Sequence, residues 1–440
     1  MLLPVFLILN PMTYSLVDAA ASTGEDGPLM HDRNLRIEMI FGGLEFPTNM
    51  DFLGRDDILI IEKDKGTVQR IVNGEKLDRP ILDIDVSNQN ERGLLGIAIS
   101  KHKGESPSNV YLYFTESADE EDGSDYCPKI IYCEAGNNPK GNRLYKYEFI
   151  SGTLVNPELL LDLPASPGSD HNGGSLVMGP DNNLYLIVGD LSLRNSQVSN
   201  IDEGIQADGM SGILRVTQDG GVVLPTILGD QNPLDMYYAY GIRNSFGIDF
   251  DPLTGNLWDT ENGPDYGDEI NLVEPGFNSG WEKIQGIWEQ GQDSGESSSQ
   301  ETPSDLVDFE GKGKYSDPEF TWRLPVGLTS IKFLDSDKLG EEYENDLLVA
   351  DINGNIYHFE LNDQRTELIL DDSLADKVAD TAEEYEETLF ASGFNGITDI
   401  EVGPDGYLYV LAFHERTKAD RTHYYGQGAI YKVVPEDEED

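Results

Sequence analysis

The chain has 440 residues and carries 30 Lys and Arg against 82 Asp and Glu, which gives a formal net charge of −52 at pH 7. Nucleic acids and anionic membrane surfaces attract proteins through Lys and Arg, so this excess of carboxylates excludes both as partners. A cation, a neutral molecule or a basic protein remains compatible with the charge. Hydrophobic residues make up 38% of the chain and aromatic residues 9%, which predicts a globular protein with a packed core.

The N-terminal end of the chain predicts export. Residues 1–22 contain a short apolar stretch, 2–9, and then a run of small residues, 19–21, an order typical of a cleaved secretory signal. The alternative is an apolar end without a targeting role, because no basic segment precedes the apolar stretch. No later stretch approaches the ~18 apolar residues that span a bilayer, so we expect a soluble mature chain with no membrane insertion.

The chain has two cysteines, Cys127 and Cys133, close together in a polar segment. In an exported protein we expect them to form a disulfide that closes a small loop. Two unpaired thiols are the alternative, since two cysteines without a nearby histidine make a poor zinc site.

One pattern returns along the chain: a strand, a turn rich in Gly, Asp, Asn and Pro, and a second strand with aromatic residues, while helical periodicity is nearly absent. Six β-meanders of this kind predict an all-β fold, a six-bladed β-propeller of four-stranded blades that extends over residues 35–434. We expect residues 35–43 to form a strand beside the last blade and so close the ring. The copies lie at 50–71, 97–116 with 142–149, 176–190, 248–263, 331–361 and 400–415.

Two acidic segments fall outside the repeats. Residues 291–310 are rich in Ser, Gly and acids and contain no Lys or Arg, which predicts a surface loop. Residues 435–440 are almost all acidic and predict a disordered tail. We expect neither segment to carry chemistry.

Three other segments have more polar residues than the turns of a propeller require. His171 precedes one predicted strand and Asp190 ends the next, so a hairpin brings both side chains to the same end. Arg243 and Asn244 stand just before another strand, and a tight turn is predicted at 263–264. In a propeller such positions gather at one face of the central channel, where we expect these residues to converge.

These residue types permit hydride or acyl transfer on a polar substrate. His171 is suited to act as a general base near neutral pH, and Asp190 would fix its tautomer and raise its basicity. Arg243 would hold a developing oxyanion, and the carbonyl oxygens of Gly263 and Pro264 suit Ca²⁺, which prefers oxygen ligands. The alternative is purely structural: the histidine and the aspartate hold turns, and the arginine forms an ion pair between two blades.

The same segments resemble the soluble sugar dehydrogenases that depend on pyrroloquinoline quinone (PQQ), the glucose/sorbosone dehydrogenase family. The resemblance extends from about residue 35 to residue 434, and its motifs occur in the family's order. The motifs are NERGLLG at 90–96, DHNGG at 170–174, GD at 189–190, GIRN at 241–244, ENGP at 261–264 and GDEINL at 267–272.

The resemblance implies a six-bladed propeller with PQQ and Ca²⁺ over the channel mouth. It assigns the role of base to His171, which takes the proton of the sugar's anomeric hydroxyl as a hydride passes to the quinone. Asp190 matches the carboxylate that supports this base, and Arg243 matches the cation over the quinone oxygens. Gly263 and Pro264 match the backbone ligands of the Ca²⁺. Three further residues match positions that contact the cofactor: Glu91, Asp170 and Asn244.

Relatives in this family meet the three carboxylates of PQQ with basic residues from the last two blades. The corresponding stretches of this chain, 351–355 and 394–399, contain no Lys or Arg. Arg194 and Arg323 are the candidate substitutes.

The predicted function is therefore that of an exported quinoprotein that oxidises a neutral aldose at its anomeric hydroxyl by hydride transfer to PQQ, with Ca²⁺. Two alternatives stay open. One is a noncatalytic extracellular Ca²⁺-binding propeller that binds carbohydrate or protein, which the missing basic residues favour. The other is a Ca²⁺-dependent hydrolase of the lactonase type.

Overall fold

The structure is a computed structural model that describes residues 27–100, 109–123, 125, 139–192, 195–287, 302–413 and 427–436. The predicted signal segment, both cysteines and Arg194 lie outside these residues, as do most of the acidic loop and of the acidic tail. The described residues form thirty strands and a single α-helix, α1 (Ala382–Glu387), so the fold is all-β. None of the described helices is long and apolar enough to cross a membrane.

The strands form six sheets, and each of the six predicted repeats falls in a different sheet. The first sheet contains β3 (Pro47–Gly54), β4 (Asp57–Glu62), β5 (Thr67–Val72) and β6 (Glu75–Lys76), with β7 (Leu82–Asp83) also paired to β5. The second contains β8 (Leu94–Ile99), β9 (Asn109–Glu116), β10 (Gly141–Ile150) and β11 (Thr153–Leu163). The third contains β12 (Leu176–Met178), β13 (Leu184–Val188), β14 (Gly212–Val216), β15 (Tyr237–Tyr240), β19 (Phe277–Asn278) and β20 (Lys314–Tyr315).

The other three sheets follow the same plan. The fourth contains β16 (Gly247–Phe250), β17 (Leu257–Glu261), β18 (Asp268–Val273), β21 (Phe320–Trp322) and β26 (Val378–Ala379). The fifth contains β22 (Leu328–Phe333), β23 (Leu347–Asp351), β24 (Ile356–Leu361), β27 (Leu389–Ser392) and β1 (Leu29–Met30), with β25 (Leu368–Ile369) paired to β24. The sixth contains β28 (Ile397–Val402), β29 (Leu408–Phe413), β30 (Gln427–Pro435) and β2 (Leu35–Glu45).

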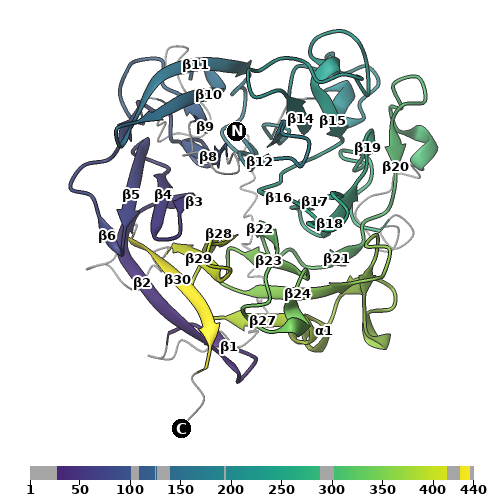
Figure 1. The fold of residues 1–440 in the computed structure, drawn as a ribbon. Helices are drawn as coiled ribbons and strands as arrows, with labels where there is room; N and C mark the ends of the chain where they lie inside the picture. The colour runs from purple at the N-terminus through teal and green to yellow at the C-terminus, as the bar shows by residue number, and fades with distance from the viewer. Residues whose placement is uncertain are drawn as a thin grey trace, which may run out of the picture.

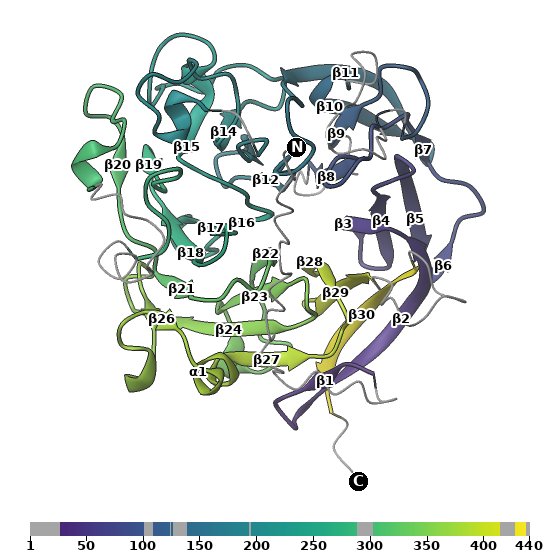
Figure 2. The ribbon, with the colours of Figure 1, turned by 180° about the vertical axis from the view of Figure 1, so that it is seen from behind.

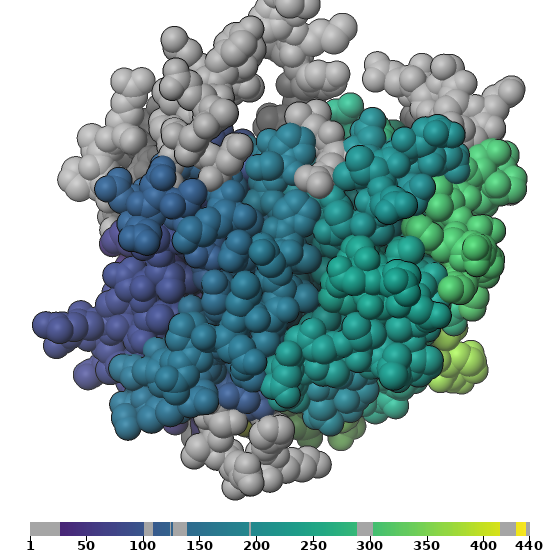
Figure 3. Space-filling view, turned by 90° about the horizontal axis from the view of Figure 1, so that it is seen from above, coloured from purple at the N-terminus to yellow at the C-terminus, as the bar shows by residue number. Residues whose placement is uncertain are grey.

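The sheets surround a common centre, as both ribbon views show (Figures 1 and 2). The innermost strands β3, β8, β12, β16, β22 and β28 contact one another in this order, and β28 returns to β3. The architecture is therefore a β-propeller. From the side, the segments coloured purple, blue and teal lie next to one another as successive slabs (Figure 3).

The prediction of four strands per sheet is exact for only two of the six sheets. Every sheet does have four antiparallel strands counted from the centre, but short strands extend the others at the outer edge. Strands β19 and β20, for example, belong to the long connection between β18 and β21 and pair in parallel beside β15. Long connections that run along an outer edge satisfy its free backbone groups, which explains the extra strands.

The ring closes as predicted for residues 35–43. Strand β2, close to the start of the described chain, pairs antiparallel with β30 at its end, with Leu35 opposite Pro435 and Glu45 opposite Gln427. The sixth sheet therefore joins both ends of the chain. This pairing covers the edge of β30 and links the two ends of the described chain, which stabilises the ring as a single unit.

The hydrophobic core lies between the sheets and is divided into six clusters, one for each pair of neighbouring sheets. Leu59 and Ile60 illustrate the division, because these consecutive residues of β4 face opposite neighbours. Leu59 packs in the cluster with Leu112 of the second sheet, and Ile60 packs in the cluster with Leu411 of the sixth. Strands buried on both faces read as continuous apolar runs, as β4 does.

Carboxylates on the innermost strands hydrogen-bond to the backbone of the next sheet. Asp51 Oδ2 accepts from the backbone nitrogen of Ile99 at 2.8 Å. Asp249 Oδ2 accepts from the backbone nitrogen of Phe333 at 2.9 Å. Asp399 connects three sheets, since Oδ2 accepts from Met50 N at 2.9 Å and Oδ1 accepts from Ser330 Oγ at 3.1 Å, and burial raises the pKa of Asp399. These contacts join the inner strands of neighbouring sheets around the channel.

We expect Asp399→Ala to lower the free energy of unfolding by about 1–3 kcal/mol, because it leaves a buried backbone N–H without an acceptor. Urea unfolding followed by circular dichroism measures the loss. Asp363→Ala, at an exposed position in the turn after β24, is the matched control and should change the free energy of unfolding by less than about 0.5 kcal/mol. Equal stability of the two variants would show that the contact does not hold the sheets together.

Candidate active site

A histidine and a carboxylate meet at one end of the third sheet. His171 lies in the segment that leads into β12, and Asp190 lies just after β13, so the β12–β13 hairpin places both at the same end. His171 Nδ1 is 2.6 Å from Asp190 Oδ1, and the two side chains are 12% and 10% exposed. The structure therefore brings together the pair that the sequence predicted to be close. A neutral ring that donates from Nδ1 to the carboxylate presents Nε2 as a proton acceptor.

Asp190 has two further donors, and the sequence predicted neither of them. Its Oδ1 accepts from the backbone nitrogen of Ser192 at 2.7 Å, and its Oδ2 accepts from the indole Nε1 of Trp281 at 2.8 Å. Trp281 lies in the connection between β18 and β21, which the repeat pattern did not place. Its only signal in the sequence is a tryptophan beside a glycine shortly after the GDEINL motif.

Arg243 is held between the third and fourth sheets. Its carbonyl oxygen accepts from the backbone nitrogen of Asp190 at 2.9 Å, and its own N–H donates to Glu261 Oε1 at 2.8 Å. Its Nη1 donates to the carbonyl oxygens of Asn262 and Gly263 at 2.8 and 3.1 Å. The guanidinium carbon also lies 5.4 Å from the centre of the Trp281 ring, a cation–π distance. The positive charge of Arg243 is thus fixed next to the His171–Asp190 pair.

The predicted metal ligands, Gly263 and Pro264, lie in the turn between β17 and β18. The backbone nitrogen of Gly263 donates to Asp268 Oδ1 at 2.8 Å, and a side chain at this position would collide with the Tyr266 carbonyl oxygen. The Gly263 carbonyl oxygen already accepts from Arg243, and Pro264 is exposed. Within the described ranges no three His, Cys, Asp or Glu side chains are grouped for metal binding. The assignment of Gly263 and Pro264 as backbone ligands of Ca²⁺ stays a prediction.

The residues predicted to contact a cofactor differ in how directly they contact His171. Glu91 lies next to His171, since its Oε2 accepts from the backbone nitrogen of His171 at 2.5 Å. Asn244 Nδ2 reaches Glu91 Oε1 at 3.5 Å, while its Oδ1 is buried and accepts no hydrogen bond from a described residue. Asp170 is half-buried and close enough to help raise the pKa of Glu91, although burial of Glu91 is the main cause.

Of the two candidate basic substitutes, the structure describes only Arg323. Arg194 lies outside the described residues. Arg323 is 53% exposed and its Nη1 is 3.4 Å from Asp380 Oδ2, which gives the guanidinium a partner at the surface. Arg243, by contrast, is connected to the His171–Asp190 pair, because its guanidinium lies over the Trp281 ring and its carbonyl oxygen accepts from the backbone nitrogen of Asp190.

Beneath this arrangement lie three buried carboxyl groups, those of Asp259, Glu261 and Glu269. Glu261 and Glu269 stand opposite each other on β17 and β18, and Ser279 Oγ donates to Glu261 Oε2 at 2.6 Å. Burial raises the pKa of Glu261 to about 7 and raises the pKa of both others well above the usual carboxyl value. Desolvation favours the protonated form of such groups, so these acids hold protons at pH values where surface carboxyls are ionised.

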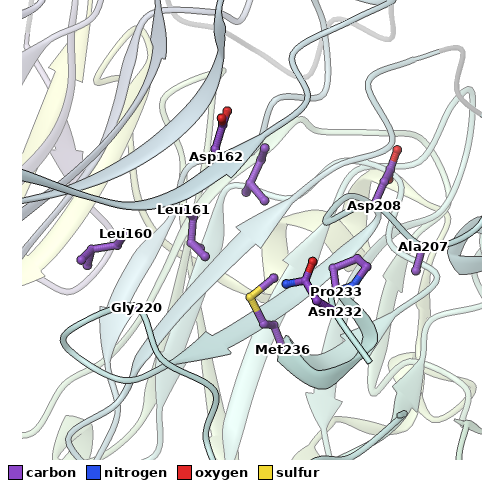
Figure 4. A pocket seen from close by; sticks show the side chains of 10 residues that line it. Leu160, Leu161, Asp162, Ala207, Asp208, Gly220, Asn232, Pro233 and Met236 are labelled. Carbon is purple, nitrogen blue, oxygen red and sulfur yellow. The ribbon is translucent and has the colours of Figure 1, made fainter. Parts of the chain in front are cut away.

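A separate pocket of about 440 Å³ lies away from this site, between β11 and the segments near β14 and β15 (Figure 4). Leu160 and Leu161 face Pro233 and Met236 across it. None of its lining residues belongs to the polar cluster around His171. We therefore assign the chemistry to the polar cluster and not to this pocket.

Comparisons with known proteins identify the family of the chain. The sequence profile described as Glucose / Sorbosone dehydrogenase matches residues 44–419, which is most of the chain. The protein belongs to the glucose/sorbosone dehydrogenase family. Members of this family are sugar dehydrogenases, so membership indicates an oxidoreductase that acts on sugars.

Individual members of the family show how far the similarity extends. The chain is 24% identical over 398 residues to the aldose sugar dehydrogenase YliI of Escherichia coli, covering 86% of this chain and 90% of the relative. It is 31% identical over 246 residues to quinoprotein glucose dehydrogenase B of Acinetobacter calcoaceticus, covering 52% and 46%. The apo-form crystal structure of the Escherichia coli soluble aldose sugar dehydrogenase superposes with a TM-score of 0.67 at 20% identity, covering 91% of this chain and all of that one. This last likeness establishes the fold.

For this dehydrogenase, we expect Trp281→Phe to lower kcat for sugar oxidation about 10-fold, because the ring beside Arg243 remains but Asp190 loses a donor. Steady-state reduction of a redox dye measures kcat, and thermal melting serves as the control for folding. Wild-type kcat in a folded variant would contradict a role for the indole N–H.

A second prediction concerns pH. Because burial raises the pKa of Glu261 from 4.5 to about 7, the folded protein keeps a proton that the unfolded chain releases. The stabilisation is complete below pH 4.5 and is lost as the pH rises through 7. We expect Glu261→Gln to reduce the loss of stability between pH 5 and pH 8 by about 1–3 kcal/mol, measured by urea unfolding at both pH values. An unchanged pH dependence would mean that Glu261 is ionised in the folded protein.

Proposed function

We propose that the protein is an exported quinoprotein that oxidises a neutral aldose at its anomeric hydroxyl, with PQQ as the hydride acceptor and Ca²⁺ as a second cofactor. The observation that carries the proposal is the His171 Nδ1–Asp190 Oδ1 contact of 2.6 Å beside the guanidinium of Arg243. A base and a fixed cation at one place are what abstraction of a hydroxyl proton requires. One structural neighbour is the PQQ-bound form of an aldose sugar dehydrogenase from Streptomyces coelicolor.

The residues around the pair fit the quinone end of PQQ. Arg243 supplies a positive charge, and Asn244 Oδ1 is a buried acceptor without a hydrogen bond from a described residue. A buried polar atom of this kind is expected to have a partner, and a bound group with an N–H or O–H would supply one. The backbone oxygens of Gly263 and Pro264 suit a hard cation such as Ca²⁺. PQQ, when bound, supplies a two-electron acceptor for the hydride.

In the proposed mechanism the chain's own residues move one proton. The Nε2 of His171 accepts the proton of the anomeric hydroxyl, while Nδ1 keeps its proton toward Asp190. The carboxylate of Asp190 stabilises the imidazolium that forms, and its bonds to Trp281 and Ser192 keep it in place. Arg243 stabilises negative charge that develops as the proton leaves. Burial of the pair excludes water that would compete for the proton.

The charge of the chain supports a neutral substrate. Glu91, Asp170 and Asp190 surround the base, and the whole chain carries a formal charge of −52, so an anionic sugar would be repelled. The same charge supports the exclusion of nucleic acid as a partner. Export remains part of the proposal and is supported by the signal-like order of residues 1–22.

The number of blades is also part of the proposal. We take each of the six sheets as one blade, which makes a six-bladed propeller. Two observations support this count: the six innermost strands contact one another in a closed order, and one apolar cluster lies between each pair of neighbouring sheets.

A noncatalytic Ca²⁺-binding propeller is the second candidate. It is favoured by the lack of Lys and Arg at 351–355 and 394–399, where relatives bind the carboxylates of PQQ. Here Asn353 instead donates to the carbonyl oxygen of Val326 at 2.6 Å, a contact within the protein.

One experiment separates the candidates. Purified protein is mixed with PQQ and Ca²⁺, and dye reduction is followed with several neutral aldoses. We expect sugar-dependent reduction, and we expect His171→Ala to lower kcat at least about 100-fold while the quinone absorbance after gel filtration stays at the wild-type level. Calcium-induced stabilisation without retained quinone or dye reduction would favour the noncatalytic propeller.

A further inference from the structure

The backbone at His171 has an unusual conformation. His171 has a φ of 61°, in the left-handed region that residues with a side chain rarely adopt, and Gly173 and Gly174 follow it with φ values of 66° and 127°. A non-glycine residue in this region is strained and persists only where its surroundings hold it. The backbone N–H of His171 makes one contact that holds it, the 2.5 Å hydrogen bond to Glu91 Oε2.

Glu91 lies in a loop that Lys63 holds in place. The ammonium group of Lys63, from the turn between β4 and β5, donates to the carbonyl oxygens of Asn88, Asn90 and Arg92 at 3.4, 3.0 and 3.0 Å. One lysine thus fixes three carbonyls on both sides of Glu91. These three hydrogen bonds restrain the loop that positions the Glu91 carboxylate.

A second anchor lies at Arg92, which is 5% exposed. Its Nη1 donates to Asp125 Oδ2 at 2.9 Å, and its Nη2 donates to the carbonyl oxygen of Gly168 at 2.9 Å. Buried, charge-assisted hydrogen bonds of this kind are strong. Arg92 therefore connects the loop of Glu91 to the segment that leads into His171.

The two loops also meet directly at Ser169. Asn90 Nδ2 donates to Ser169 Oγ at 2.8 Å, and the backbone nitrogen of Glu91 donates to the Ser169 carbonyl oxygen at 3.2 Å. With the bond to His171, residues 90 and 91 hold residues 169 and 171 at three points. The other carboxylate oxygen of Glu91 faces Asn244 Nδ2 at 3.5 Å, on the fourth sheet's side of the site.

We propose that Glu91 is a positioning residue: its carboxylate fixes the left-handed backbone of His171 and thereby aims the imidazole toward the substrate. The inference rests on the proposed function for its catalytic consequence. The sequence resemblance instead places Glu91 among the cofactor contacts, and the two roles predict different losses. A positioning residue affects kcat, whereas a cofactor contact affects retention of PQQ.

The test compares Glu91→Gln with Glu91→Ala, because the Gln amide oxygen still accepts from the His171 N–H and Ala cannot. Glu75→Gln, on the exposed strand β6, is the matched control for loss of one charge. The first measurement is hydrogen exchange of the peptide spanning 169–174 in protein without cofactor. We expect exchange at His171 to be about 10-fold faster in Glu91→Ala and unchanged in the two Gln variants.

The second measurement is dye reduction after loading with PQQ and Ca²⁺. We expect kcat to fall about 100-fold in Glu91→Ala with KM within about 3-fold, and to fall less than about 5-fold in Glu91→Gln, since a misplaced base costs turnover and not binding. If Glu91→Ala does not fold, Lys63→Met, which removes the anchor of the loop, replaces it and should also accelerate exchange at His171.

Three results would overturn the inference: unchanged exchange at His171 without the carboxylate, equal damage by Gln and Ala, or loss of bound PQQ in place of kcat. Absence of sugar oxidation in the wild-type protein would refute the proposed function alone. In that case the exchange data would still decide whether Glu91 holds the backbone of His171.

Discussion

The carboxylate of Asp190 is the group on which the arrangement of the site depends. It accepts from the His171 ring, the Trp281 indole and the Ser192 backbone, and the backbone N–H of Asp190 donates to the carbonyl oxygen of Arg243. A carboxylate with so little exposure is stable as an anion only when donors replace the water it has lost. The imidazole, the indole and the loop of the arginine therefore cannot move independently. One residue thus fixes the relative positions of the three groups: its carboxylate holds His171 and Trp281, and its backbone N–H holds the loop of Arg243.

The propeller places the groups that make these hydrogen bonds on one side of the ring. The groups that bond to His171, Asp190 and Arg243 come from loops at the ends of the second, third and fourth sheets. The fifth sheet is coupled to this side through two residues. Asp268 ties the Gly263 turn to the backbone of Val326 and Gly327 just before β22, and Asn262 exchanges two hydrogen bonds with the backbone of Leu328 at the start of β22. Hydrogen bonds between loops of neighbouring sheets thus build the site, while the apolar clusters between the sheets carry the stability of the ring.

The sequence predicted those parts of the molecule that depend on local pattern. Strands bounded by Gly, Asp and Pro marked all six repeats, and a hairpin was enough to bring His171 and Asp190 together. It did not predict Trp281, because the course of the long β18–β21 connection depends on tertiary contacts and not on periodicity. The sequence also did not predict that Glu261 and Glu269 lie opposite each other, because this position depends on the register between β17 and β18. The signal segment, the cysteine pair and Arg194 stay predictions.

The acidity of the chain favours the proposed chemistry, because the proton transfer creates a positive charge on the base. A base that accepts a proton becomes a cation, and the carboxylate of Asp190 stabilises that cation while Glu91 and Asp170 lie close by. Carboxylates that favour a protonated histidine penalise an anionic group at the same place. Arg243, held by carbonyl oxygens that leave its charge uncancelled, opposes this penalty. The site is therefore suited to take a proton from a neutral hydroxyl, and an anionic cofactor requires both Arg243 and a bound cation beside it.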